Sequence, residues 1–247
     1  SDVYKRQVED NNFAGIDLDY ESIKLTDKEK YLEFIRLLST ELHKKDKLLV
    51  VTVLAKWGEN ITYSYKPETR EAQDWQVLSQ YADQVRIMAY DFTHSSDDYP
   101  GPIGPTSWIK QILEYAKLTI PPQKTVLGIH LYAYEWYQAE NTGGLDIVVD
   151  PNSNPNATDN TARAYTYQTV KSVLEKPGEL SSFQDEVIFF YTTNNSNGIS
   201  ERRALVFIDD KGVEARQKIA QEYGINGIVF WRLGEEADIY NLIINSK

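Results

Sequence analysis

Three carboxylate residues, Asp17, Asp19 and Glu21, alternate with apolar residues in the segment 13–21. In a β-strand every second side chain points to the same face, so the three carboxylates share one face of this segment. Carboxylates crowded in this way repel each other when ionised, which raises the pKa of at least one of them. Enzymes that cleave glycosidic bonds usually use a protonated carboxyl group beside an ionised one.

Two other interpretations of this segment stay open at this point. Alternation of acidic and apolar residues also occurs in strands that simply expose one face to water. A cluster of carboxylate oxygens can instead bind Mg²⁺ or Ca²⁺. The rest of the sequence must decide between these interpretations and glycoside cleavage.

The composition excludes several classes of function. The chain has 247 residues, of which 41% are hydrophobic, and its net charge is −11. This charge argues against nucleic acid and anionic membrane surfaces as partners. No apolar run approaches the roughly 20 residues that span a bilayer, and with no cysteine the chain has no disulfide or thiolate–metal site. Neutral ligands such as sugars suit this composition, and the 17 tyrosines and five tryptophans offer stacking surfaces for them.

Strands and helices are predicted to alternate along most of the chain. Hydrophobic patterns predict strands at 13–21, 48–54, 85–90, 125–132 and 225–231. Helices are predicted from a capping box at 26–29 through Leu42, and at 75–81, 108–117, 213–223 and 237–244. This alternation predicts an α/β fold with a parallel sheet covered by helices. No Gly-x-Gly-x-x-Gly follows a strand, which argues against a dinucleotide-binding sheet.

The connection from Ala133 to Phe207, about 75 residues long, is too long for a simple loop. It opens with an Asn- and Pro-rich segment at 141–160, followed by a predicted helix at 164–174. Two strands joined by an Asn-rich turn are then predicted at 187–192 and 203–208. We therefore expect a small α+β insertion. Because this insertion follows the C-terminal end of a strand, it would form one wall of the ligand-binding face of a barrel.

Four motifs in this chain resemble those of glycoside hydrolase family 18. The family's strand-four signature, Asp-Gly-x-Asp-x-Asp-[Trp/Tyr]-Glu, is matched in order by Gly15, Asp17, Asp19, Tyr20 and Glu21, with Ala14 in place of the leading Asp. The other matches are Met88-Ala89-Tyr90-Asp91 for strand six, 128–132 for strand seven, and Trp231 at the end of strand eight. Segments 101–105 and 230–235 are most similar to a bacterial branch that includes spore-cortex-lytic N-acetylglucosaminidases.

The resemblance implies a (β/α)₈ TIM barrel, of which we expect strands four to eight to be present and strands one to three to be missing. Three further strand–helix units would need roughly 80–100 residues, so we expect a C-terminal fragment that is inactive or poorly soluble alone, because its sheet edges are open. The expected divisions are 1–7, which resembles a translated adapter sequence; 8–132, barrel units four to seven; 133–208, the insertion; and 209–247, the end of the barrel.

The resemblance also implies a substrate-assisted mechanism, in which the sugar's own 2-acetamido oxygen attacks the anomeric carbon. Glu21 would be the general acid, and Asp19 would orient the acetamido group through its N–H. Asp17 would share a proton with Asp19 or serve as a structural acid. Tyr90 would donate its hydroxyl to the acetamido oxygen, unless it is an ordinary core tyrosine.

For substrate binding, the resemblance implies that Trp231 forms the floor beneath the reacting sugar. Asp91 would contact a sugar hydroxyl, Met88 would pack beneath the site, and Tyr132 is a weaker contact candidate. No cofactor and no metal ion is implied.

The predicted function is hydrolysis of β-1,4-linked N-acetylglucosamine glycans, as in peptidoglycan or chitin. The alternative is a non-catalytic sugar-binding protein on the same scaffold, although such relatives usually lose the acid that corresponds to Glu21. The partner would be an oligo- or polysaccharide, and the full-length parent is expected to be extracellular or associated with a cell wall or spore.

Overall fold

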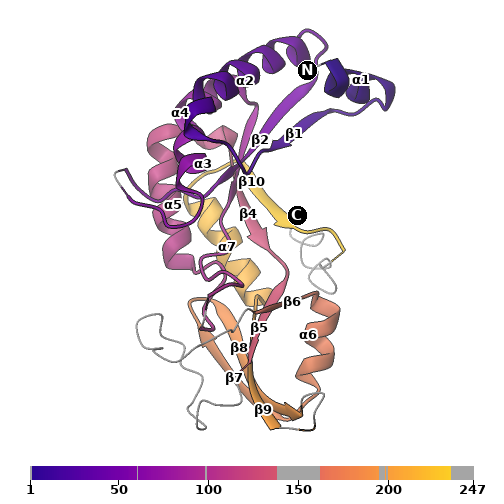
Figure 1. The fold of residues 1–247 in the computed structure, drawn as a ribbon, viewed down its shortest axis with the longest axis vertical. Coiled ribbons are helices and arrows are strands. Elements are labelled where there is room, and N and C mark those ends of the chain that lie inside the picture. The colour runs from indigo at the N-terminus through magenta and orange to yellow at the C-terminus, as the bar shows by residue number, and fades with distance from the viewer. Residues whose placement is uncertain are drawn as a thin grey trace. The chain divides into compact units, whose positions relative to one another are not determined.

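The computed structural model describes residues 2–59, 61–97, 99–137, 162–194, 198 and 200–234 (Figure 1). The chain forms two compact units. The first consists of Ser1–Ala89, Ile109–Gly128 and Ile219–Val229, and the second of Tyr90–Trp108, Ile129–Lys218 and Phe230–Lys247. The predicted helix at 237–244 and the Asn-rich segment at 141–160 lie outside the described residues.

A five-stranded sheet forms the centre of the first unit, and the last residues of two of its strands belong to the second unit. Its strands, in spatial order, are β1 (Gly15–Asp19), β2 (Leu48–Leu54), β3 (Gln84–Met88), β4 (Thr125–His130) and β10 (Gly227–Trp231). The first three neighbouring pairs are parallel. All five predicted strands are confirmed, and the Val-rich strand β2 is almost wholly buried, as its continuous apolar run predicted.

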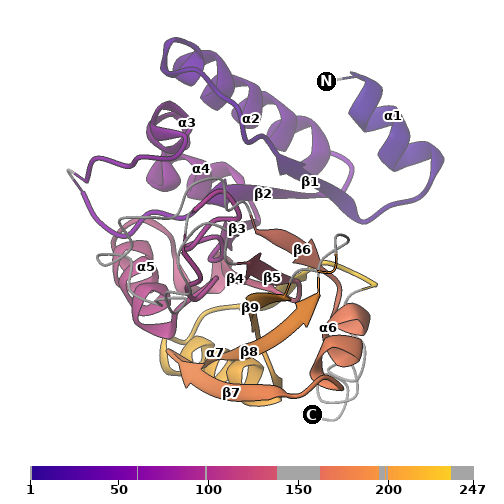
Figure 2. The same cartoon turned by 60° about the horizontal axis from the view of Figure 1, so that its bottom comes forward.

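Helices of the first unit pack against this sheet. The first unit contains α1 (Asp2–Asp10), α2 (Lys28–His43), α3 (Pro67–Ala72) and α4 (Trp75–Tyr81), with short 3₁₀ helices η1 (Leu25–Asp27) and η2 (Pro122–Lys124). Helices α5 (Thr106–Thr119) and α7 (Asp210–Glu222) have residues in both units. Figure 2 shows α2 and α4 running along the side of β2 and β3. The predicted helical spacing in α2 is confirmed, because Tyr31, Ile35, Leu38 and Leu42 are buried.

One local prediction for the first unit is wrong, and two of its helices were not predicted. The capping box is wrong: Thr26 lies inside η1, which runs directly into α2, so Asp27 occupies the N-cap position and makes no capping hydrogen bond through its side chain. Residues 2–7, to which no element was assigned, form most of α1, and Val8 in the same helix is buried. The six-residue helix α3 was not predicted, because it is too short to show a helical period.

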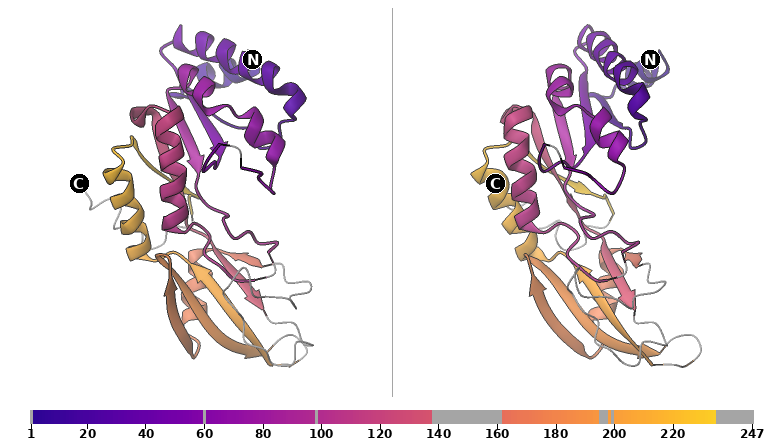
Figure 3. Two further views of the ribbon diagram at one scale, coloured as in Figure 1. Left: turned by 90° about the vertical axis from the view of Figure 1, so that its left-hand side faces the viewer. Right: turned by 60° about the vertical axis from the view of Figure 1, so that its left-hand side comes forward.

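The second unit contains a five-stranded antiparallel sheet with the strand order β6-β5-β9-β8-β7. The elements are β5 (Ala133–Tyr137), β6 (Arg163–Tyr165), α6 (Tyr167–Leu174), β7 (Gly178–Phe183), β8 (Glu186–Asn194) and β9 (Ser200–Phe207). Strands β8 and β9 run side by side along their length (Figure 3). Val170 and Val173 of α6 pack against Leu205 and Phe207 on one face of the sheet, which gives the unit its own apolar core.

The two predicted strands of this region are confirmed by β8 and β9, but the predicted helix began too early. Residues 163–165 form β6 because they pair with β5, a long-range contact that outweighs local helix preference. Strands β5 and β7 were not predicted. Most of the Asn-rich turn predicted between β8 and β9 lies outside the described residues.

Candidate active site

The register of the parallel sheet places the acidic residues on one face. Asp19 lies opposite Thr52 on β2, and Thr52 lies opposite Arg86 on β3. Residues in register on neighbouring strands point to the same face, so Asp17, which is two residues before Asp19, shares that face. Leu18, between the two acids, is buried on the opposite side. The alternation predicted for this segment is therefore confirmed for β1.

Asp17 is held by two side chains from the neighbouring strands. Its Oδ1 accepts a hydrogen bond from Oγ1 of Thr52 at 2.8 Å, and its Oδ2 forms an ion pair with Nη1 of Arg86 at 2.7 Å. Among the described residues, the buried Nε of Arg86 has no hydrogen-bond partner. Sequence reasoning missed Arg86, although a single arginine between Val85 and Ile87 in an apolar strand was a usable signal.

The crowding of carboxylates acts on Asp19. Removal of water around its carboxyl group raises the pKa of Asp19, and the negative charges of Glu21 and Asp17 raise it further, against the opposing charge of Lys66. The nearby Tyr31 is buried on α2, and burial, together with Tyr20 and Asp19, raises the pKa of its hydroxyl. Both groups therefore favour their protonated forms more than they would in water.

Glu21 lies two residues beyond the end of β1 and faces a lysine. Its Oε2 accepts a hydrogen bond from Nζ of Lys66 at 2.8 Å, and both side chains are partly exposed. Burial lowers the pKa of Lys66, but hydrogen bonds with Glu21 and Tyr65 outweigh this effect and raise it overall. A groove adjoins the pair, lined by Ser22, Ile23, Lys24, Pro67, Glu68 and Thr69 as well as by the pair itself.

Two of the three carboxylates pair with cationic side chains. Within the described ranges, no three His, Asp or Glu side chains are arranged to hold a metal ion. Asp17 instead faces a guanidinium group and Glu21 an ammonium group.

None of the described helices is long and apolar enough to cross a bilayer.

Four of the predicted site residues belong to the second unit, and three of them form one cluster. Tyr90 packs edge to face against Tyr132, with ring centroids 6.2 Å apart. Asp91 has a left-handed backbone (φ 58°), and its Oδ1 accepts hydrogen bonds from the hydroxyls of Tyr132 and Tyr134. Burial and the charge of Asp91 raise the pKa values of both tyrosines. Tyr134 was not predicted, because nothing in its local pattern marks it as a partner of Asp91.

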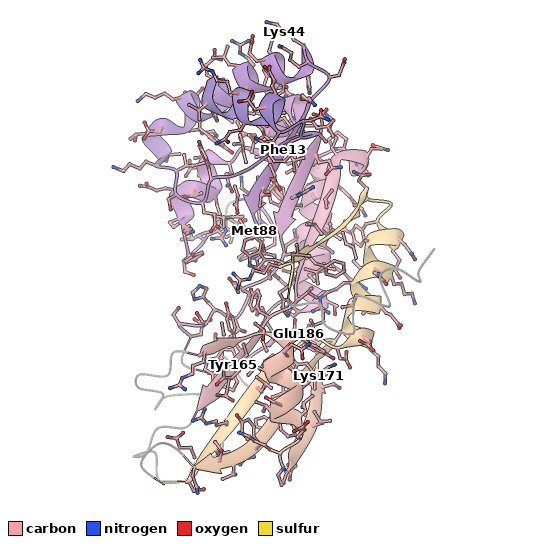
Figure 4. The ribbon with its side chains drawn as sticks, turned by 90° about the vertical axis from the view of Figure 1, so that its right-hand side faces the viewer. Phe13, Lys44, Met88, Tyr165, Lys171 and Glu186 are labelled. Carbon is pink, nitrogen blue, oxygen red and sulfur yellow. The ribbon has the colours of Figure 1, made fainter. Side chains whose placement is uncertain are left out.

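The remaining two predicted residues stand at strand ends. Trp231 is the last residue of β10; the residue is 48% exposed, and its carbonyl accepts a hydrogen bond from the amide of Leu131 at 2.8 Å. Met88 ends β3 in the first unit, on the same face as Arg86, and is partly buried (Figure 4). The structure thus groups the three acids and Met88 in the first unit, and Tyr90, Asp91 and Tyr132 in the second.

Comparison with known proteins gives consistent matches. The family model described as "Glycosyl hydrolases family 18" matches residues 2–236. The uncharacterized glycosylase YvbX of Bacillus subtilis is 24% identical, with 93% of this chain and 60% of that protein covered. The cortical fragment-lytic enzyme of B. subtilis is 25% identical, with 90% of this chain and 47% of the enzyme covered.

A solved structure shares the fold. The crystal structure of the Bacillus cereus spore cortex-lytic enzyme SleL superposes with a TM-score of 0.74 at 24% identity, with 94% of this chain and 48% of that chain covered. The chain spans about half the length of this enzyme and of the cortical fragment-lytic relative.

Proposed function

Because this chain belongs to glycosyl hydrolase family 18 and has a TIM-barrel-type α/β fold, we propose that it carries the acidic centre of a glycosidase for β-1,4-linked N-acetylglucosamine glycans. The observation that supports this best is the grouping of Asp17, Asp19 and Glu21, in which burial, and then the negative charges of Glu21 and Asp17, raise the pKa of Asp19. We also propose that β1, β2, β3, β4 and β10 correspond to barrel strands four to eight.

The proposed mechanism uses the substrate's acetamido group as nucleophile. Its oxygen forms a bond to the anomeric carbon while the bond from that carbon to the leaving oxygen breaks, and Glu21 transfers its proton to the leaving oxygen. Glu21 then takes a proton from the water molecule that opens the resulting oxazolinium ring. Asp19 accepts a hydrogen bond from the acetamido N–H, and Asp17, which is fixed by its ion pair with Arg86, lies beside Asp19 on the same face.

The ion pair between Glu21 and Lys66 bears on the first step. Glu21 must hold a proton to act as the acid, and a protonated carboxyl group no longer pairs with an ammonium ion. We propose that an incoming glycan displaces the ammonium group of Lys66 from Glu21. Tyr90, Asp91, Tyr132 and Trp231 are proposed to bind the reacting sugar, as the family resemblance implies.

The proposed substrate is peptidoglycan or a chitin-like glycan. One relative is named a cortical fragment-lytic enzyme, and another protein of the same fold is named a spore cortex-lytic enzyme. These names favour peptidoglycan as the substrate and a spore or cell wall as the location.

Hydrolysis of defined glycans tests the proposed function. Chitin oligosaccharides and peptidoglycan glycan strands are incubated with the protein, and mass spectrometry should detect products with new N-acetylglucosamine reducing ends. Cellulose oligomers, which carry a hydroxyl in place of the acetamido group, should stay intact. Binding of either acetamido glycan without cleavage would support the non-catalytic sugar-binding alternative instead.

Asp19→Asn is expected to raise stability at neutral pH while it lowers activity. Because the folded protein raises the pKa of Asp19 above its usual 3.8, folding favours the protonated acid, and the stability contribution of this group is lost as pH rises through the folded-state pKa. The neutral amide avoids this loss. The melting temperature of Asp19→Asn should therefore exceed that of the wild type at pH 7, and the difference should shrink towards pH 3.

Asp46→Asn serves as the control for this measurement, because Asp46 is exposed in the turn after α2. Its melting temperature should follow that of the wild type across the same pH range. An Asp19→Asn variant that is less stable than the wild type at pH 7 would contradict a raised pKa of Asp19 in the folded protein.

A further inference from the structure

We infer that residues 66–73, which include helix α3, form the element that positions Glu21, and that Thr69 and Gln73 are its positioning residues. The inference rests on the proposed role of Glu21 as the acid.

Glu21 lies beyond the last residue of strand β1. Strand β1 ends at Asp19, and residues 20–24 adopt no regular secondary structure. A ladder of backbone hydrogen bonds therefore fixes the direction of Asp17 and Asp19 but not that of Glu21. General acid catalysis needs the acid within hydrogen-bond reach of the leaving oxygen, so other contacts must orient this segment.

Thr69 holds the chain on the C-terminal side of Glu21. Its Oγ1 accepts a hydrogen bond from the amide of Ile23 at 3.0 Å and donates one to the carbonyl of the same residue at 3.2 Å. Both residues are buried. One hydroxyl group thus satisfies both backbone groups of a residue two positions from the acid.

Gln73 holds the chain on the N-terminal side. Its Nε2 donates to the carbonyl of Tyr20 at 3.1 Å, and its Oε1 accepts from the amide of Leu54 at 2.8 Å. Gln73 is fully buried, and its own carbonyl accepts from Nζ of Lys56 at 2.5 Å. One amide side chain therefore ties the residue before Glu21 to the end of β2, the strand that neighbours β1.

The segment is itself fixed in place. Arg70 is buried, and its Nε donates to the carbonyl of Ala55 at 2.8 Å, just after β2. Its guanidinium group lies over the ring of Tyr63 at 5.0 Å from the centroid, and a further hydrogen bond joins it to the carbonyl of Tyr65. Thr69 and Gln73 therefore act from a rigid support, and Lys66 at the start of the same segment contacts the carboxylate directly.

Thr69→Val gives the sharpest test, because valine has nearly the same shape but lacks the hydroxyl. The backbone groups of Ile23 lose their buried partner, and Glu21 shifts. Since a displacement of about 1 Å can cost about 100-fold in rate, we expect kcat to fall by about 10- to 100-fold while KM stays within about two-fold. Thr69→Ser retains the hydroxyl and should restore most of kcat.

Thr125→Val is the matched control. Thr125 is buried in the same unit, at the start of β4, and its hydroxyl also donates to a backbone carbonyl, that of Pro121, at 3.2 Å. The Thr125→Val variant should lose about as much stability as Thr69→Val, but its kcat should match that of the wild type. Equal kcat values for the two valine variants, measured well below both melting temperatures, would overturn the positioning role and leave the proposed hydrolase function standing.

Amide hydrogen exchange provides a readout that does not need catalysis. Exchange at Ile23 should become at least about ten-fold faster in Thr69→Val than in Thr69→Ser or Thr125→Val, because only the first variant frees this amide. Unchanged exchange would overturn the inference even in a protein that cleaves glycans. A wild type that cleaves none would count against the proposed function, while the exchange data would still decide whether residues 66–73 hold this segment.

Discussion

Glu21→Gln is expected to lower kcat on N-acetylglucosamine oligomers by about 10²–10⁴-fold, the usual contribution of a positioned general acid. The amide has the shape of the protonated acid but cannot transfer a proton to the leaving oxygen. Substrate affinity should change little, because Glu21 is proposed to act in the transition state rather than in ground-state binding. Steady-state kinetics and calorimetric binding of a chitin oligosaccharide measure the two quantities separately.

Glu29→Gln is the control for this substitution. Glu29 is exposed in the first turn of α2, so its change removes the same charge without touching the acidic row. Its kcat should match that of the wild type. A Glu21→Gln variant that still turns over glycans at the wild-type rate would mean that another group supplies the proton, and the assignment of Glu21 would fail.

Arg216→Met is expected to destabilise the second unit by about 3–5 kcal/mol, the usual cost of breaking a buried ion pair from one side. Nη2 of Arg216 on α7 contacts Oε1 of Glu186 at 2.7 Å, and both side chains are fully buried (Figure 4 labels Glu186). Glu186 also accepts hydrogen bonds from the amides of Ile103 and Gly104, both at 2.7 Å. Without the guanidinium group, a carboxylate is left buried without its counter-ion.

Urea unfolding followed by fluorescence measures this loss, and Lys218→Met, an exposed substitution on the same helix, is the control. Burial already raises the pKa of Glu186, against the opposing charge of Arg216. Protonation therefore relieves the variant, so its loss of stability should be smaller at pH 4 than at pH 7. A loss below about 1 kcal/mol at pH 7, as expected of an exposed pair, would show that the pair does not hold the unit together.

The same buried pair explains why His130 is not a catalytic candidate. Its ring is fully buried, with Nε2 at 3.8 Å from Oε1 of Glu186. Burial and the nearby charge of Arg216 lower its pKa well below the ordinary value. His130 is therefore a neutral core residue at the end of β4.

Local patterns were sufficient for much of the first unit. The two-residue period predicted that Asp17 and Asp19 share a face, and the apolar run of β2 predicted a strand buried on both sides. These predictions succeed because successive side chains in a strand point to alternate faces, so the face of each residue follows from its position in the strand. The helical spacing of α2 and the end of α7 near Gly224, which has φ 61°, are equally local properties.

The amino-acid sequence by itself thus determined the acidic row, the alternation of strands and helices, and the family. Only the tertiary structure decided which partner each acid receives: Arg86 for Asp17, and Lys66 for Glu21. It also decided that Thr69 and Gln73 hold the chain around Glu21. These pairs join residues 45 to 69 positions apart, and strand register and loop closure, which no local period encodes, bring them together.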